Sequence, residues 1–98
     1  EKDDIELLKI GRHFWFEDAH KKIMKIVVGR NFSENLKLKQ HKKKKDILVE
    51  LENFPGPITL IRSYKGKISK EAVERAKELT QYYSVKARGR IGVKFKIW

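Results

Sequence analysis

The sequence predicts an α+β domain, in which a small mixed or antiparallel sheet has one long and one short helix packed on one of its faces. Three observations lead to this fold class. Short β-branched segments recur between turn signals, which is typical of strands. Residues 69–84 place their apolar side chains at helical spacing. The chain has 98 residues, which fits one domain spanning residues 1–98.

The strands are indicated by alternation of side chains and by the breaks between segments. In residues 46–52, Ile47, Val49 and Leu51 alternate with positions that include two glutamates, which predicts a half-buried strand. The final segment alternates in the same way over its whole length, and a Pro-Gly-Pro turn interrupts the chain between two of the segments. We expect extended structure at residues 5–10, 22–29, 46–52, 58–62 and 90–98.

Two helices are expected. Ser69 suits the N-cap of the long helix, because its hydroxyl can accept a hydrogen bond from a free backbone N–H of the first turn. The short helix would follow Gly29, with Asn31 or Ser33 as its N-cap. The expected apolar face of the long helix carries Ala72, Val73, Ala76, Leu79, Thr80 and Tyr83. The residues at helical spacing in the short helix are Phe32, Leu36 and Gln40.

The charge of the chain indicates a polyanionic partner. The chain carries 24 Lys and Arg against 13 Asp and Glu, a net charge of +11. Basic side chains that neutralise phosphates release condensed counterions, so this balance favours nucleic acid over two other interpretations, an acidic membrane surface and solubility alone. No apolar run approaches the roughly 20 residues of a membrane span, and no membrane partner is expected. The absence of cysteine suits the cytoplasm, where we expect the protein to be located.

Catalysis within this chain is not expected. His13, His20 and His41 lie far apart and form no metal-ligand spacing. None of the serines lies in a nucleophile elbow. The stretch YKGKIS resembles the end of a phosphate-binding loop, but the first glycine is missing and Ile68 occupies the place of the Ser or Thr. A β-turn before a helix is the better interpretation, and we expect no metal and no cofactor.

The Gly-Arg-Asn turn after residues 22–28 is the strongest local candidate for a site. A strand that ends at Gly29 and enters a helix leaves backbone N–H groups free at the helix start, and Arg30 can add a planar guanidinium fork beside them. Asn31 and Asn35 can position polar groups on the same corner. The structural alternative is that Asn31 caps the helix, Asn35 bonds a neighbouring loop and Arg30 covers the edge of the core. Local chemistry alone leaves both open.

Further basic residues lie near aromatic ones, which suits RNA because base stacking adds to phosphate contact. The run Lys42–Lys45 would raise the positive potential beside the Gly-Arg-Asn turn, and Tyr64 stands among basic residues. Trp15 and Phe14 are expected to pack in the core or at its edge rather than to serve as stacking platforms. The predicted RNA-binding residues are Arg30, Asn31, Asn35, Lys39, Lys42, Lys43, Lys44, Lys45, Arg62, Lys65, Arg88 and Arg90.

Three ordered segments, VVGRNFSENLKL, DILVELENFPGP and ISKEAVERAKELTQYYS, make the chain resemble the NFACT-R domain, a small RNA-binding module. The resemblance runs from about Phe14 to Phe95. It implies an RNA-binding role and no catalytic residues. The residues that carry it are Gly29, Arg30, Asn31, Asn35, Asp46, Pro55, Gly56, Tyr83 and Ser84.

Two further features refine what the resemblance implies. Ribosome-associated members carry His where this chain has Glu50 and Ile58, so a standalone ribosome-binding factor ranks lowest. The opening ELLKIGRHFWF together with FPGP is similar to the variant appended to ThiI/MnmA-like PP-loop ATPases, the enzymes of tRNA thiolation. That variant implies a fragment of a longer protein that binds tRNA as an accessory domain. A domain that docks onto the PP-loop ATPase domain or onto an acidic sulfur carrier is the alternative from another class.

Overall fold

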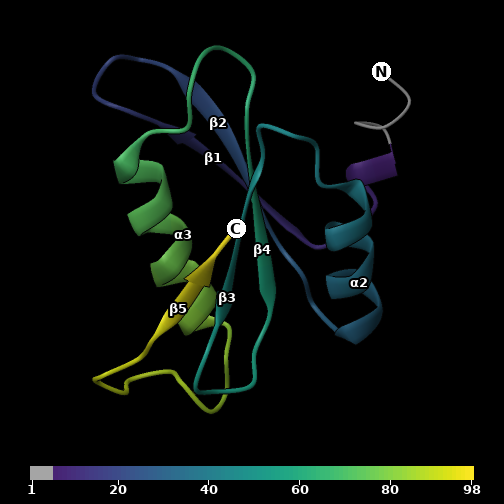
Figure 1. Cartoon of the computed structure of the whole chain (residues 1–98), viewed down its shortest axis with the longest axis vertical. Coiled ribbons are helices and arrows are strands. Elements are labelled where there is room, and N and C mark those ends of the chain that lie inside the picture. Colours follow the sequence, from purple (N-terminus) through teal and green to yellow (C-terminus); the bar gives the residue numbers. More distant parts are fainter. Residues whose placement is uncertain (1–5) are drawn as a thin grey trace.

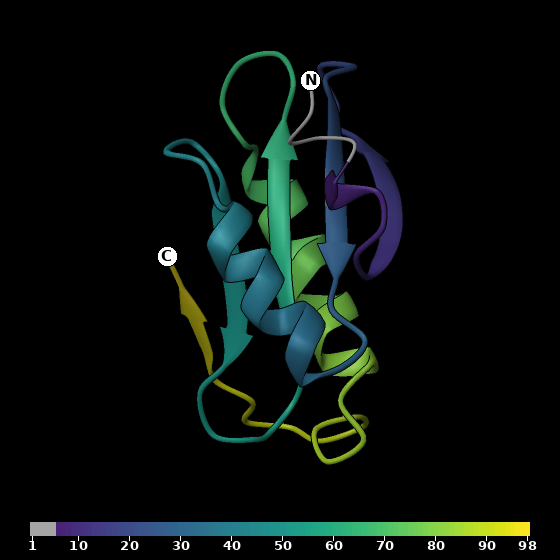
Figure 2. The ribbon, with the colours of Figure 1, turned by 90° about the vertical axis from the view of Figure 1, so that its right-hand side faces the viewer.

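The computed structural model describes residues 6–98, which form a five-stranded antiparallel sheet with one helix on each face (Figure 1). The strands lie in the order β1-β2-β4-β3-β5 across the sheet. Figure 2 shows α2 in front of the sheet and α3 behind it. The elements are β1 Arg12–Glu17, β2 Ile23–Val28, α2 Phe32–His41, β3 Ile47–Leu51, β4 Ile58–Ser63, α3 Lys70–Tyr82 and β5 Phe95–Ile97. The α+β fold with an antiparallel sheet is therefore confirmed.

Two apolar cores lie on opposite faces of the sheet. Met24, Ile26 and Val28 of β2 pack with the buried face of α3, whereas Val27 packs with Leu38 of α2. The central strands are thus apolar on both faces, because successive side chains of a strand point to opposite sides. The expectation that both helices cover one face is wrong, since each face of the central strands needs its own cover.

Both helix starts follow the expected capping chemistry. Asn31 is the N-cap of α2 and accepts a 2.9 Å hydrogen bond from the backbone N–H of Glu34. Ser69 caps α3 by accepting from the backbone N–H of Ala72 at 3.2 Å. The expected face of α2 is wrong, because Leu38 is buried while Phe32 is 77% exposed. The buried residues of α3 are Ala72, Ala76, Leu79 and Thr80, all on the expected face.

Two expected strands differ from the structure. Residues 6–10 form a helical turn and a bend instead of a strand, and Leu7 and Ile10 are buried in the core on the α2 side; Ile5 lies outside the described residues. At the other end of the chain, Phe95–Ile97 pairs with β3, Trp98 continues the backbone hydrogen bonds to Leu48, and Ile91 is 96% exposed. Residues 90–93 alternate in sequence but are not part of a strand in the structure.

Candidate nucleic-acid interface

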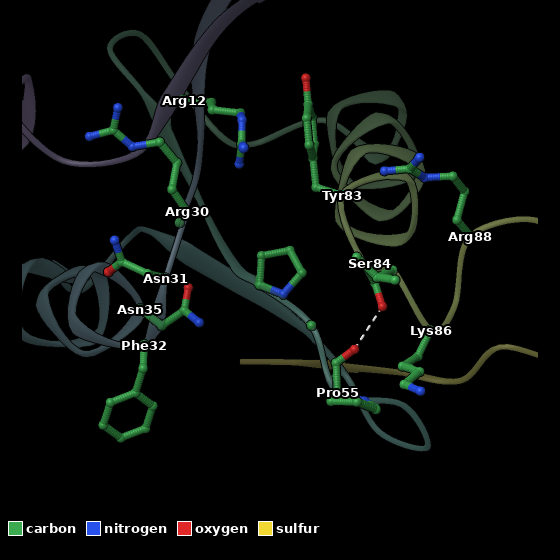
Figure 3. Close-up of a pocket in the computed structure, with 14 residues that line it drawn as sticks. Arg12, Arg30, Asn31, Phe32, Asn35, Pro55, Tyr83, Ser84, Lys86 and Arg88 are labelled. Atoms are coloured by element: carbon green, nitrogen blue, oxygen red, sulfur yellow. Dashed lines mark hydrogen bonds between the residues drawn. The ribbon is translucent and has the colours of Figure 1, made fainter.

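A cleft of about 610 Å³ lies at the end of the sheet where β2 leads into α2 and β4 begins (Figure 3). Three loops and the end of α3 meet there, together with the first residue of β1. The residues that line it are Arg12, Gly29, Arg30, Asn31, Phe32, Asn35, Pro55, Gly56, Pro57, Tyr83, Ser84, Val85, Lys86 and Arg88. Of the nine residues that carry the resemblance described above, all except Asp46 line this cleft.

The Gly-Arg-Asn turn is tied to β4 by paired hydrogen bonds. The backbone N–H of Gly29 donates to the carbonyl oxygen of Ile58 at 3.0 Å, and the N–H of Ile58 donates to Oδ1 of Asn35 at 3.0 Å. A Cβ atom on Gly29 would overlap that same Oδ1. The structural alternative therefore holds for Asn31, which caps α2, and for the oxygen of Asn35. The side-chain nitrogen of Asn35 points into the cleft (Figure 3).

The opposite wall of the cleft is fixed by Ser84. Its hydroxyl donates a 2.7 Å hydrogen bond to the carbonyl oxygen of Pro55 and accepts a 3.0 Å bond from the N–H of Ala87 (Figure 3). Gly56 passes so close that a Cβ there would lie 2.5 Å from a methyl carbon of Leu51. Ser84 thus joins the Pro-Gly-Pro turn to the segment that follows α3.

Arg30 does not offer a free guanidinium. Its Nε and Nη2 donate to the carboxylate of Glu34 at 2.9 Å and 2.6 Å, and its backbone N–H donates to the same carboxylate at 2.9 Å. The side-chain hydrogen bonds from Arg30 lower the pKa of Glu34 to about 2. Glu34 therefore stays ionised, and a phosphate that approaches Arg30 has to compete with it.

Three further cations line the cleft. The guanidinium of Arg12 lies 4.3 Å from the ring centre of Tyr83 and points into the cleft (Figure 3). Arg88 lies 4.8 Å from the ring centre of Tyr82 and donates through Nε to its carbonyl oxygen at 2.7 Å. Lys86 is exposed on the same wall. None of the lining residues among residues 6–98 is an Asp or Glu, so the charge of the cleft suits a phosphate group.

Comparison with known proteins assigns the chain to a family. The sequence model described as NFACT protein RNA binding domain matches residues 11–97. The chain belongs to this family. The family assignment makes RNA the partner of the NFACT-R domain, in agreement with its net charge of +11.

A solved structure supports the NFACT-R fold. The C-terminal part of the fibronectin/fibrinogen-binding protein of Streptococcus suis is 26% identical and superimposes with a TM-score of 0.72. The alignment covers 91% of this chain but 34% of the solved chain, so the NFACT-R domain spans about a third of that protein fragment. No curated protein matches the chain.

The NFACT-R domain does not bring all the predicted RNA-binding residues together. Arg30, Asn31, Asn35 and Arg88 line the cleft, whereas the lysine run belongs to the loop before β3. Lys39 lies 5.3 Å from the ring of Trp98. The remaining predicted residues outside the cleft are Lys42, Lys43, Lys44, Lys45, Arg62, Lys65 and Arg90.

The prediction that Arg62 lies on the RNA-contacting surface is wrong. Its side chain is 5% exposed, and its Nη2 forms a 2.7 Å ion pair with Asp46 and also donates to the carbonyl oxygen of His41 at 3.0 Å. Because two buried charges compensate each other here, this arginine is held in the interior. Arg62 therefore fixes the start of β3 against β4.

Sequence reasoning missed two cations of the cleft. Arg12 begins β1 and Lys86 follows α3, so neither stands near the Gly-Arg-Asn turn in the sequence. The available signal was the basic segment after Ser84, which contains Lys86. No sequence feature near β1 indicated that Arg12 lines the cleft. The expectation that Trp15 packs in the core or at its edge is also wrong, because this side chain is 64% exposed.

The described residues contain neither a metal-binding cluster nor a membrane-spanning helix. Within residues 6–98, no group of three His, Asp or Glu side chains is arranged to hold a metal ion. Over the same residues, none of the helices has the length and apolar character required to cross a bilayer.

Proposed function

We propose that this NFACT-R domain holds folded tRNA as an accessory domain of an ATP-dependent tRNA thiolation enzyme in the cytoplasm, and that it is not itself an enzyme. The cleft carries the RNA-binding part of the proposal. Arg12, Lys86 and Arg88 approach it from two walls, and the ring of Tyr83 lies beside them. The thiolation context rests on the opening ELLKIGRHFWF and on FPGP, the features shared with the PP-loop variant.

The cleft would bind a backbone phosphate at a place where the RNA chain bends. Its walls come from separate elements that are joined by the Ser84 and Asn35 hydrogen bonds, so its cations are already positioned before RNA arrives. A positioned site loses less conformational entropy on binding than side chains that become ordered only when the ligand binds. A folded RNA, whose phosphates have fixed spacing, gains most from such a site. Unstructured RNA would engage mainly the general positive charge.

Binding of this chain to folded tRNA and to an unstructured RNA of the same length, over a salt series, tests the proposal. With about four to six phosphates engaged, the slope of log K against log salt should be roughly −3.5 to −5.5 on duplex regions. Folded tRNA should bind more tightly than the unstructured RNA. Equal binding of both, or a slope near −1, would overturn the proposal.

Two variants locate the binding surface. Arg12→Gln and Arg88→Gln should each weaken tRNA binding and reduce the slope by about 0.9, the contribution of one phosphate. Arg75→Gln is the matched control, because Arg75 is exposed on the outer face of α3 and pairs with Glu78 at 3.2 Å. A loss as large for Arg75→Gln as for the cleft variants would show only a general charge effect. Binding to the parent enzyme that survives nuclease treatment would favour the protein-docking alternative.

A further inference from the structure

A pair of exposed aromatic rings lies at the other end of the sheet from the cleft. Strand β4 runs from the cleft to the rings. Pro57, which precedes the strand, lines the cleft, and Tyr64 directly follows the last residue of the strand. A strand of this length spans roughly 20 Å. One phosphate in the cleft therefore cannot also contact the rings, and a ligand at the rings would occupy a separate site.

The two rings lie close together, one on β1 and the other just after β4, with β2 between these strands. Trp15 of β1 is 64% exposed and Tyr64 is 49% exposed, with their ring centroids 6.1 Å apart at an interplanar angle of 45°. The ammonium group of Lys25 lies 5.0 Å from the ring centre of Trp15. Trp15 stands opposite Lys25 in the β1–β2 pairing, and Lys25 stands opposite Arg62 in the β2–β4 pairing. Trp15, Lys25 and Arg62 therefore lie side by side on one face of the sheet, and Lys25 contacts the ring of Trp15.

The lysine run is anchored beside the rings. Asp46 accepts a 2.8 Å hydrogen bond from the backbone N–H of Lys43 and holds the buried Arg62. Lys43, Lys44 and Lys45 line a hollow of about 370 Å³ together with Tyr64. The run was interpreted from sequence as a positive field around the Gly-Arg-Asn turn. The structure places it instead at the aromatic end of the sheet.

From this arrangement we infer that Trp15 and Tyr64 form a stacking site for an unpaired RNA nucleotide, whose neighbouring phosphates contact Lys44, Lys45 and Lys65. The inference rests on the RNA binding of this domain but not on the cleft or on tRNA. Every base offers a flat π face, so stacking on an exposed aromatic side chain tolerates any sequence. The three lysines are exposed. The acids near the rings are Glu17, two residues after Trp15, and Asp46, whose charge is compensated by Arg62. The positive charge around the rings favours RNA over an uncharged apolar partner.

Fluorescence of Trp15 gives a direct test, because the chain contains two tryptophans and the other can be replaced. In a Trp98→Phe background, single-stranded hexaadenylate should quench the emission of Trp15. An abasic RNA hexamer with the same number of phosphates should bind through charge and leave that emission unchanged. Quenching by both hexamers would overturn the stacking assignment, since it would follow from charge alone.

Affinity measurements complete the test. Trp15→Leu should weaken hexaadenylate binding about 5-fold or more and leave the abasic hexamer unaffected, while Trp15→Phe should retain most of the difference. Tyr64→Leu is a second variant with the same expectation, and thermal unfolding confirms that each variant is folded. Equal affinities of the unaltered chain for the two hexamers, or no effect of both Leu variants, would refute the site.

The outcomes also separate this inference from the proposed function. Arg88→Gln should weaken tRNA binding and preserve the difference between hexaadenylate and the abasic hexamer. If the cleft variants abolish tRNA binding and Trp15→Leu changes nothing, the stacking site is wrong and the cleft proposal stands. If Trp15→Leu removes the difference while the cleft variants have no effect on tRNA, the cleft proposal fails and the stacking site remains.

Discussion

The guanidinium of Arg30 and the carboxylate of Glu34 form a two-point ion pair at 2.9 Å and 2.6 Å. The two residues are one helical turn apart, and the N–H of Arg30 also donates to Glu34. A fork that meets a carboxylate at two points is also suited to a phosphate. The sequence predicted that Arg30 binds RNA, but two of its guanidinium donors are already hydrogen-bonded to Glu34.

Glu34→Gln should strengthen RNA binding. The substitution removes a negative charge next to the cleft and releases the guanidinium of Arg30, so tRNA affinity should rise roughly threefold to tenfold at constant salt. Glu78→Gln removes the same charge from the outer face of α3 and is the control for the change in net charge. A filter-binding or anisotropy titration measures the tRNA affinity of both variants, and the rise should be larger for Glu34→Gln. An equal rise in both would mean that Arg30 takes no part in binding.

Gly29 and Asn35 should be coupled in stability. Asn35→Ala leaves the N–H of Ile58 without its acceptor and should cost about 1–3 kcal/mol of unfolding free energy. Gly29→Ala places a methyl group against Oδ1 of Asn35 and should cost a similar amount through overpacking. In the double variant the clash has no partner, so its total cost should be smaller than the sum. Urea unfolding of the four proteins measures this, and strict additivity would contradict the close contact.

The sequence predicted the features of this fold that are set by residues close together along the chain, such as the helix caps and the turns. The caps Asn31 and Ser69 each act on a backbone group three residues away, so a short window contains both partners. The alternation in β3 and the Pro-Gly-Pro break likewise lie within a few residues. The landmarks of the cleft were found through a family resemblance, and their meeting at one end of the sheet follows from the strand order.

The errors concern features set by distant residues. Arg62 was predicted as a surface cation because its acidic partner Asp46 lies 16 positions earlier, in the loop just before β3. Trp15 was expected to pack in the core or at its edge, but its strand is at the edge of the sheet and its face there is not covered by α2. A second apolar face of the central strands was indicated by neighbouring apolar residues such as Ile26, Val27 and Val28, whose side chains point to opposite sides of the sheet.

Arg62→Met should destabilise the domain without removing an RNA contact. The substitution leaves the buried carboxylate of Asp46 without its counter-charge and should cost about 3–5 kcal/mol of unfolding free energy. The double variant Arg62→Met with Asp46→Asn removes both charges and should be more stable than Arg62→Met alone. Urea unfolding gives the stabilities, and tRNA titration of the folded double variant tests binding. Because the double variant keeps the net charge of the chain, its affinity for tRNA should be unchanged, and a clear loss would contradict the assignment of Arg62 to the interior.

His13 should make the stability of the domain depend on pH near neutrality. Its Nε2 lies 2.8 Å from the carbonyl oxygen of Ile10, and its Nδ1 is buried and has no hydrogen-bond partner among the described residues. Burial lowers the pKa of His13 below 6.5, with a smaller contribution from the charge of Lys25. The unfolded chain therefore takes up a proton at a higher pH than the folded one. Stability should fall as the pH drops through 6.5, and the loss should level off below the folded pKa.

Unfolding free energies measured between pH 7.5 and pH 5.5 test this dependence. His13→Gln keeps a donor for the carbonyl oxygen of Ile10 but has no titrating group, so it should flatten the decline. His20→Gln, in the exposed turn between β1 and β2, is the matched control. This window lies above the pKa of about 2 of Glu34, so the Arg30 ion pair stays intact and contributes no slope. If His13→Gln and the unaltered chain lose stability in parallel, the buried imidazole is not the group that senses pH.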